Sequence, residues 1–293
     1  MRAISRTVVA LSLIIGLLIA AGCGVRSDAA ARQGRNPASF VSARGEAATL
    51  TVTVDGAPRT ALVFAATSPV PQGGAPLVLV FHGHGGTAQL VARRMRLHEL
   101  WPQATVAYLQ GLPGVVGITD PEGKRNGWQK NPGEMNDRDV RFVDAMQGEI
   151  ERRYKVDPSR VYALGHSNGA RFVNVLWAMR GEPFAAFCSA SGQGGRLLEQ
   201  VKPRSLFIIA GERDPLVPYE GQMLSVGLAR RVLHTEAARA VSKGYLRIEP
   251  GSDGIELATY LHPGGHEFPT EALPLVVEFF QRHALPQASR RVQ

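Results

Sequence analysis

The feature that most constrains the fold of this chain is the stretch 165–169, Gly-His-Ser-Asn-Gly, which lies between an apolar run and a helical pattern. The run 161–164 predicts a buried strand, and the apolar spacing in 170–180 predicts a helix. Glycines two residues before and after a serine allow a very tight strand-to-helix turn, which pushes the hydroxyl clear of the sheet edge. The N-terminus of the following helix carries a partial positive charge, which favours a developing anion. Ser167 is therefore the candidate nucleophile of the chain.

Strand and helix signals alternate along the rest of the chain. Apolar or alternating runs predict strands at 48–54, 59–64, 77–81, 105–109, 184–190, 205–210 and 257–262. Helical spacing predicts helices at 88–100, 137–153, 220–234 and 270–283, the second of them capped by Asn136. This alternation predicts an α/β fold with a mostly parallel, twisted sheet and helices on both faces. The long connection 110–135 is of the kind that is usually functional, and 237–254 shows no clear pattern.

The overall composition is that of an ordinary globular protein. The 293 residues are 44% hydrophobic and 20% charged, with a formal net charge of +8. Nucleic-acid binding requires basic residues that cluster in a stripe, whereas here they are dispersed and run no longer than pairs such as Arg93-Arg94. The sequence therefore predicts no nucleic-acid partner.

The first residues predict export from the cytoplasm. Arg2 and Arg6 precede an apolar run at 8–21, which is the order found in secretory signal peptides, and the run is too short to predict a membrane span. It ends before Gly-Cys and resembles a bacterial lipobox, although Ala20 stands where Leu is usual. Cleavage before Cys23 and lipidation of that residue would anchor the protein to a bacterial membrane. The alternative is ordinary secretion after cleavage at the end of the apolar run.

These signals divide the chain into four parts. We expect a lipoprotein signal peptide at 1–22, a flexible tether at 23–45, an α/β domain carrying Ser167 at 46–286 and a C-terminal tail at 287–293. With Cys23 lipidated, Cys188 has no disulfide partner within the chain and is expected to be a small buried hydrophobe.

Two further side chains follow predicted strands, as Ser167 does. Asp214 lies just beyond the strand at 205–210, and His266 follows the strand at 257–262. Sites in open parallel sheets form at the carboxyl ends of the strands, and Ser, Asp, His is one of the chain orders in which catalytic triads occur. His266 would take the proton of Ser167 and return it to the leaving group, while Asp214 would hold the imidazole in the required tautomer.

Other residues compete for these two roles: Glu212 and Glu220 for the acid, and His262 and His283 for the base. We favour Asp214 because it lies a few residues beyond the strand end, where the loop reaches inward. We favour His266 because the Gly-Gly pair before it gives the loop conformational freedom.

The loop 82–86, His-Gly-His-Gly-Gly, follows a predicted strand and is expected to stabilise charge that develops in the reaction. Its glycines let backbone N–H groups approach a substrate closely. We predict that the N–H groups of Asn168 and His84 bind this oxyanion, with Gly85 as the second choice for the latter. His82 is expected to pack under the loop as a structural residue.

Neither pair of neighbouring histidines predicts a metal site. His82 and His84 are accompanied by no carboxylate or cysteine. The Pro-Gly-Gly between His262 and His266 rules out two ligands on one face of a helix.

Several motifs together resemble the secreted esterases of the polyhydroxybutyrate depolymerase-like group, which merges with the feruloyl and acetylxylan esterases. The motifs lie at 81–83, 108–112, 127–128, 136–140, 156–162, 165–169, 214–219 and 264–266. The resemblance implies the α/β-hydrolase fold and hydrolysis of carboxylic esters through Ser167, Asp214 and His266, without a cofactor. Many members have Cys or Thr where this chain has His84, and Trp soon after the catalytic histidine, where this chain has 267–269, Glu-Phe-Pro.

The sequence as a whole predicts a secreted, membrane-anchored serine esterase that acts through an acyl-enzyme. Its expected substrates are polyhydroxyalkanoate oligomers, feruloyl or acetyl sugar esters, or short-chain acyl esters, and Trp128 and His166 are predicted to contact them. Two alternatives stay open. One is an acyltransferase or peptidase on the same fold, and the other is a lipoprotein that keeps the fold as a non-catalytic binding module.

Overall fold

The computed structural model of the protein describes residues 46–116 and 120–286. The predicted signal peptide at 1–22, the lipidation site Cys23, the tether at 23–45 and the tail at 287–293 lie outside the described residues. Among the residues that are described, no helix combines the length and the apolar composition needed to cross a membrane.

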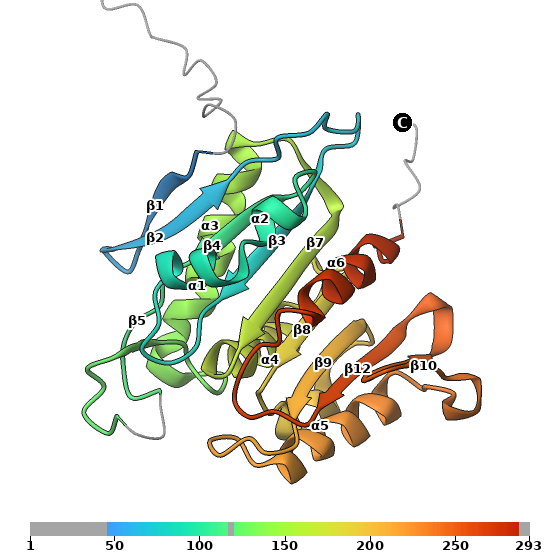
Figure 1. Cartoon of the computed structure of the whole chain (residues 1–293). Helices are drawn as coiled ribbons and strands as arrows, with labels where there is room; N and C mark the ends of the chain where they lie inside the picture. The colour runs from blue at the N-terminus through green and yellow to red at the C-terminus, as the bar shows by residue number, and fades with distance from the viewer. Residues whose placement is uncertain (1–45, 117–119, 287–293) are drawn as a thin grey trace, which may run out of the picture. The chain divides into compact units, whose positions relative to one another are not determined.

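A ten-stranded sheet forms the framework of the described chain (Figure 1). Its strands are β1 (Ala48–Val54), β2 (Ala57–Phe64), β3 (Ala75–Phe81), β4 (Thr105–Leu109), β7 (Val156–His166), β8 (Ala186–Ala190), β9 (Ser205–Gly211), β10 (Val241–Lys243), β11 (Leu246–Pro250) and β12 (Glu256–His262). They lie in the order β1-β2-β4-β3-β7-β8-β9-β12-β11-β10. Two short strands, β5 (Leu112–Pro113) and β6 (Asn126–Gly127), pair separately within the long connection.

The middle of the sheet is parallel and both of its edges are antiparallel. The strands from β4 to β12 in the spatial order pair in parallel, while β1 and β2 on one side and β11 and β10 on the other pair antiparallel. The central strands β3, β4, β8 and β9 are buried at every position. Continuous apolar runs of this kind are expected where helices cover both faces of a parallel sheet.

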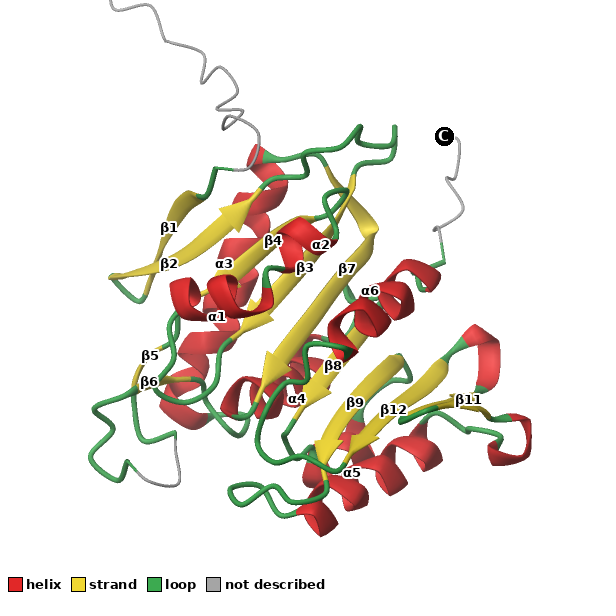
Figure 2. Ribbon diagram, in the orientation of Figure 1, coloured by secondary structure: helices red, strands yellow, loops and turns green. Residues whose placement is uncertain are grey.

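Helices cover the sheet on both sides (Figure 2). One core cluster contains the apolar faces of α1 (Ala88–Met95), α2 (Leu97–Leu100) and α6 (Ala272–Arg282). The other contains those of α3 (Arg138–Arg153), α4 (Asn168–Arg180) and α5 (Tyr219–Val232). The predicted α/β fold, with a mostly parallel sheet between two layers of helices, is therefore confirmed.

The predicted helix at 88–100 is broken into α1 and α2. Arg96 has a left-handed backbone, with φ of +48°, and separates the two helices. The break lets the Leu97 N–H donate to the hydroxyl of Tyr108 on β4 at 3.0 Å, and it buries the Leu97 side chain completely. Tertiary packing thus overrides a continuous helical pattern.

The predicted N-cap of α3 is wrong. Asn136 lies in a left-handed turn before the helix, and the capping position belongs to Asp137, whose side chain makes no capping hydrogen bond. The Asp137 carboxylate instead accepts hydrogen bonds from the Gly133 N–H and the Gln129 side chain, both at 2.7 Å. It therefore stabilises the preceding loop rather than the helix end.

The segment without a clear sequence pattern, 237–254, forms β10 and β11 and extends the sheet beyond β12. Short 3₁₀ turns complete the described secondary structure at Glu134–Asp137, Gly195–Gln200, Ala237–Arg239 and Ser252–Gly254. Ser167, Asp214 and His266 follow the carboxyl ends of β7, β9 and β12, where sites form in open α/β sheets.

Candidate active site

Ser167 lies in the turn between β7 and α4 with a strained backbone. Its φ of +58° and ψ of −121° are uncommon for any residue other than glycine. The close approach of β7 and α4 explains the flanking glycines: a Cβ at Gly165 would lie 2.2 Å from the Gly169 carbonyl oxygen, and one at Gly169 would lie 2.3 Å from the Phe81 carbonyl oxygen. The turn therefore needs glycine at both positions.

A line of hydrogen bonds joins Ser167, His266 and Asp214. The His266 Nε2 lies 2.8 Å from the Ser167 Oγ, and the His266 Nδ1 lies 2.8 Å from the Asp214 Oδ2. Because a carboxylate only accepts hydrogen bonds, Nδ1 carries the hydrogen and Nε2 is free to accept the serine proton. The structure thus brings together the three residues singled out from sequence, from the loops that follow β7, β9 and β12.

Asp214 is buried and held from several sides. Its Oδ1 accepts the N–H groups of Leu216 and Val217, each at 2.8 Å, and the Gln222 Nε2 lies 3.3 Å from its Oδ2. Burial raises the pKa of Asp214, but the hydrogen bonds from Val217, His266 and Leu216 outweigh that effect, so the pKa lies below its ordinary value. The carboxylate therefore stays charged beside His266.

The competing acids and histidines are engaged elsewhere or face solvent. Glu212 and Glu220 are exposed at the surface. His262 is buried and accepts the Gly264 N–H at its Nδ1, 3.2 Å away. The Nδ1 of His283 lies 2.7 Å from the Phe279 carbonyl oxygen at the end of α6. Neither of these histidines contacts Ser167, whose hydroxyl is bonded to His266.

The N–H of Asn168 lies directly behind Ser167. Asn168 is the first residue of α4, and the first N–H groups of a helix have no acceptor within it. The Asn168 side chain is hydrogen-bonded to Trp128 and to the Val116 carbonyl, so the backbone N–H is the donor of this residue that is left for an oxyanion.

The loop 82–86 lies against the turn between β7 and α4 that carries Ser167, which we call the elbow. A Cβ at Gly83 would be 3.3 Å from the Ser167 Cβ. The Gly83 carbonyl accepts the Gly86 N–H at 3.0 Å and the His82 Nδ1 at 2.8 Å. A trans peptide directs its C=O and N–H to opposite sides, so the His84 N–H points away from those two donors. Gly85 is excluded as the second choice, because its N–H donates to the Asn126 carbonyl at 2.7 Å.

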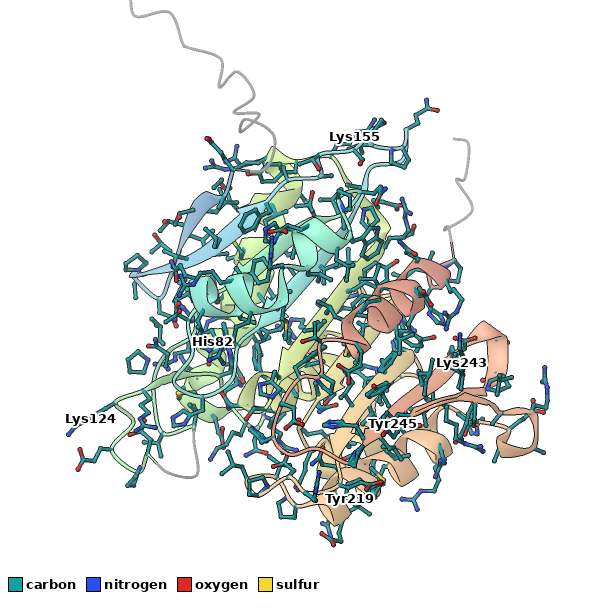
Figure 3. The ribbon with its side chains drawn as sticks, in the orientation of Figure 1. His82, Lys124, Lys155, Tyr219, Lys243 and Tyr245 are labelled. Atoms are coloured by element: carbon teal, nitrogen blue, oxygen red, sulfur yellow. The ribbon has the colours of Figure 1, made fainter. Side chains whose placement is uncertain are left out.

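His82, labelled in Figure 3, is the structural residue that the sequence suggested. Its Nε2 accepts the Gly111 N–H at 3.0 Å, so its hydrogen lies on Nδ1, which donates to the Gly83 carbonyl. Burial lowers the pKa of His82, which keeps the ring neutral. His84, in contrast, directs its imidazole at Asp120, 3.4 Å away.

The prediction that Trp128 contacts the substrate is wrong. Its side chain has no exposed surface and lies in the core, stacked on Phe142 and Phe172. The indole Nε1 donates to the His82 carbonyl at 2.9 Å. A tryptophan in a Gly/Pro-rich connection has the same sequence signal whether it lines a cleft or closes a core, and only packing distinguishes the two.

His166 lies beside the candidate base. The ring centroids of His166 and His266 are 5.1 Å apart. Burial, followed by the charge of His266, lowers the pKa of His166 to about 4. His166 is therefore neutral at physiological pH, and its contact with a substrate stays a prediction.

Gln222 is a site residue that the sequence reasoning missed. It is completely buried on α5 and donates to the Val217 carbonyl at 2.8 Å as well as approaching Asp214. Its spacing with Val226 and Ala229 places it on the inward face of the helix. A glutamine at such a position is the signal that would have indicated a buried polar partner.

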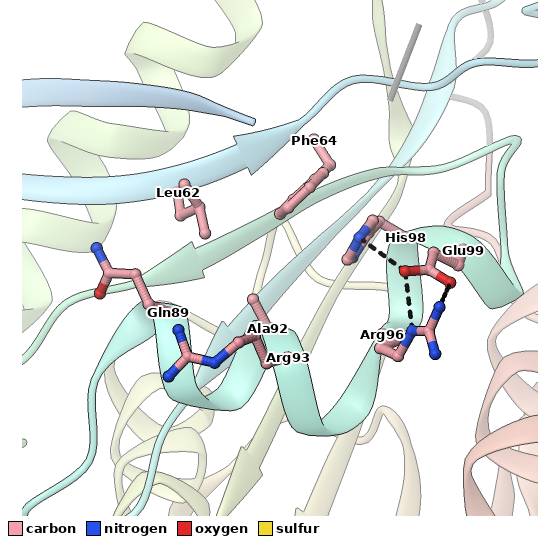
Figure 4. Close-up of a pocket in the computed structure, with 8 residues that line it drawn as sticks. All are labelled: Leu62, Phe64, Gln89, Ala92, Arg93, Arg96, His98 and Glu99. Carbon is pink, nitrogen blue, oxygen red and sulfur yellow. Dashed lines mark hydrogen bonds and ion pairs between the residues drawn. The ribbon is translucent and has the colours of Figure 1, made fainter. Parts of the chain in front are cut away.

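No metal-binding group accompanies the site in the part of the chain that the structure describes: no three His, Cys, Asp or Glu side chains there are arranged to hold an ion. A pocket of about 410 Å³ lies elsewhere, between β2, α1 and α2 (Figure 4). Phe64 stacks on His98 within it, with 3.6 Å between the ring centroids. None of its lining residues belongs to the site around Ser167.

Comparisons with known proteins give relatives among esterases. No family model matches the chain. A putative esterase, NocK, of Nocardia uniformis is 32% identical over 164 residues, which cover 53% of this chain and 44% of that protein. A probable feruloyl esterase C of Aspergillus clavatus is 29% identical over 174 residues, covering 57% of this chain and 58% of that protein. The chain thus spans about half the length of the curated relatives it matches.

Solved structures of esterases share the architecture. The acetyl xylan esterase from Aspergillus awamori superposes with a TM-score of 0.62 at 13% identity, over 81% of this chain and all of that one. A hyperthermophilic esterase from Pyrobaculum calidifontis gives a TM-score of 0.57 at 13% identity, over 80% of this chain and 85% of that one. Likeness at such low identity concerns the fold. By its architecture, this chain has the α/β-hydrolase fold of these esterases.

Proposed function

We propose that the protein is a serine hydrolase that cleaves carboxylic esters. The observation that carries this proposal is the unbroken line of hydrogen bonds from the Ser167 hydroxyl through His266 to the Asp214 carboxylate. A serine hydroxyl becomes an effective nucleophile only when a base is placed to remove its proton, and a buried carboxylate beside that base orients it. The sequence relatives that are named as esterases support the same reading.

The proposed reaction proceeds through an acyl-enzyme. His266 Nε2 takes the proton of Ser167 as its Oγ attacks the ester carbonyl carbon, and a tetrahedral oxyanion forms. When the intermediate collapses, the bond to the alcohol breaks and His266 protonates the departing oxygen. His266 then takes a proton from a water molecule, whose oxygen attacks the acyl carbon. As the bond between that carbon and the Ser167 Oγ breaks, His266 returns the proton to Oγ, and the acid leaves.

The N–H groups of Asn168 and His84 are proposed to bind the oxyanion. Asn168 offers a free N–H at the start of α4, where the helix dipole also favours negative charge. The carbonyl side of the Gly83–His84 peptide is fixed by two donors, which leaves its N–H preset before a substrate arrives. Donors that are fixed in advance avoid reorganisation during the reaction.

The proposed substrates are acyl groups on sugars, polyester oligomers or short-chain acyl esters. The names of the relatives, a feruloyl esterase and an acetyl xylan esterase, favour the sugar esters. His84 stands where many of the resembling esterases carry Cys or Thr, and 267–269, Glu-Phe-Pro, stands where they often carry Trp. These departures are expected to give the chain its own choice among such esters.

We also propose that the protein works outside the cytoplasm, held to a bacterial membrane by lipid on Cys23. This proposal rests on the basic, then apolar, then Gly-Cys order of residues 1–23.

The test is hydrolysis by the wild-type protein and by Ser167→Ala. We expect the wild type to hydrolyse members of a panel of p-nitrophenyl acyl esters, methyl ferulate and polyester film, and the variant to lose this activity because it lacks the nucleophile. A fluorophosphonate probe, which reacts with activated serines, is expected to label the wild type at Ser167.

Absence of both turnover and labelling in folded wild-type protein would contradict the proposal and favour a non-catalytic binding module. Retained turnover in Ser167→Ala would show that another residue is the nucleophile. Addition of a sugar acceptor separates hydrolysis from acyl transfer, since transfer would yield an acylated sugar in place of free acid.

A further inference from the structure

We infer that Trp128 is a positioning residue that sets the separation between the two N–H groups proposed to bind the oxyanion. The inference rests on the proposed function. Trp128 lies in the long connection between β4 and α3 and has no exposed surface. It is hydrogen-bonded both to Asn168 of α4 and to the loop 82–86, which carry the two proposed donors.

The main chain of Trp128 is bound to the side chain of Asn168. The Trp128 N–H donates to the Asn168 Oδ1 at 2.8 Å, and the Asn168 Nδ2 donates to the Trp128 carbonyl at 2.9 Å. In these two bonds the N–H and the C=O of one residue are both paired, as they are between neighbouring strands. They tie Trp128 to the residue whose own N–H is the first proposed donor.

The indole of Trp128 is bound to the second donor's loop. Its Nε1 donates to the His82 carbonyl at 2.9 Å, two residues before His84. The neighbouring Gly127 lets the connection pass close to the elbow, since a Cβ there would lie 2.8 Å from the Asn168 Oδ1. Trp128 thus links α4 to the loop that follows β3.

Aromatic packing fixes the indole between these attachments. Its ring stacks on Phe172 of α4, with centroids 5.3 Å apart and planes at 13°, and meets Phe81 of β3 edge-on at 5.2 Å. A tryptophan held by two hydrogen-bonded ends and two rings has little freedom to shift. Oxyanion stabilisation depends on donor positions within a few tenths of an ångström, so this rigidity bears on the reaction rather than on substrate binding.

The test compares Trp128→Phe with a matched control, Trp177→Phe. Trp177 is also buried, lies on α4, stacks on Phe187 at 5.2 Å, and donates its Nε1–H to the Lys202 carbonyl at 2.9 Å. Each variant therefore keeps an aromatic ring and loses one indole N–H···O=C bond, but only Trp128 is attached to the His82 loop.

We expect kcat of Trp128→Phe on a p-nitrophenyl ester to fall roughly 10- to 100-fold, with KM within about twofold of wild type. The affinity for a trifluoromethyl ketone, which forms a tetrahedral adduct with the serine, is expected to fall by a similar factor. Trp177→Phe is expected to keep kcat and KM while losing a comparable amount of thermal stability.

Equal kcat values in the two folded variants, or a change confined to KM, would overturn the inference. If Trp128→Phe does not fold, Asn168→Ala replaces it. That variant keeps the backbone N–H and loses the two bonds to Trp128, together with the longer bond from Nδ2 to the Val116 carbonyl at 3.4 Å. An unchanged kcat would then be the contrary result. Failure of the proposed function is seen separately, as wild-type turnover no greater than that of Ser167→Ala.

Discussion

The hydrogen bonds to Asp214 determine the charge of its carboxylate and the tautomer of His266. Four donors surround its carboxylate, and they hold its pKa below the ordinary value despite burial. A charged acceptor at the Nδ1 of His266 keeps the hydrogen on that nitrogen, so Nε2 stays able to accept the proton of Ser167. The contribution of Asp214 is therefore orientation and charge, and it does not require the carboxylate to take a proton.

The substitution Asp214→Asn tests this account. An amide donates to Nδ1 as readily as it accepts, which allows the imidazole tautomer that carries its hydrogen on Nε2, where it can no longer accept from Ser167. We expect kcat to fall by up to about 10,000-fold, the size of the effect in a well-studied serine protease. The measurement is steady-state hydrolysis of a p-nitrophenyl ester.

Glu212→Gln is the control for that experiment, because Glu212 is an exposed acid two residues away. It is expected to retain wild-type kcat. If Asp214→Asn were as active as this control, the carboxylate that orients His266 would have to belong to another residue.

At the scale of elements, a buried carboxylate joins the β10–β11 hairpin to α5. Glu249 on β11 has no exposed surface and is bonded to Arg230 of α5, to Arg247 and to the Thr235 hydroxyl, at 2.7 to 3.1 Å. Burial raises the pKa of Glu249, but the hydrogen bonds from Arg230, Arg247 and Thr235 and the charge of Arg230 outweigh it and lower the pKa to about 2. This ion cluster thus joins α5 to β11, the strand next to the edge of the sheet.

The substitution Glu249→Gln is expected to lower the free energy of unfolding at pH 7 by about 2 kcal/mol, less than for a fully buried pair because both arginines reach solvent. The folded pKa is depressed, so the stabilisation is complete above the ordinary value near 4.5 and is lost as pH falls toward 2. The difference between wild type and variant in urea unfolding should therefore shrink across that range.

Glu236→Gln is the matched control, since it removes a carboxylate from an exposed pair with Arg239. Exposed pairs contribute little, and this variant is expected to unfold like wild type. A Glu249→Gln variant as stable as this control at pH 7 would contradict the role assigned to the buried cluster.

At the scale of the whole molecule, the parallel strands gather groups from distant parts of the chain at one edge of the sheet. His266 reaches Ser167 across 99 residues of sequence and Asp214 across 52. The flanking antiparallel strands extend the sheet without contributing any of these three groups. The proposed lipid anchor on Cys23 would also act on the whole molecule, because it would hold this site at a membrane surface.

The substitution Cys23→Ser tests the anchor. Without the thiol no lipid is attached, and none of the described helices is long and apolar enough to cross a membrane. We expect the wild type in the membrane fraction of cells and the variant in the soluble extracytoplasmic fraction, as measured by immunoblotting and by metabolic labelling with a fatty acid. Membrane association that survives the substitution would contradict the lipobox interpretation.

The sequence by itself determined the features that depend on local chain geometry. The tight turn at Ser167 requires small residues at 165 and 169, and the continuous apolar runs require a sheet that is covered on both faces. The α/β fold and the candidate residues Ser167, Asp214 and His266 could be identified from these patterns, because each residue lies a few positions at most beyond the end of a recognisable strand.

Only the tertiary structure decided the features that depend on contacts between distant segments. Trp128 was expected in the cleft and lies in the core, Gly85 was a possible donor and is bonded to Asn126, and Glu249 lay in a segment without a pattern. A side chain's burial and partners are set by whichever segments pack against it, and in a sheet whose neighbours are far apart in the chain, spacing along the sequence does not specify those segments.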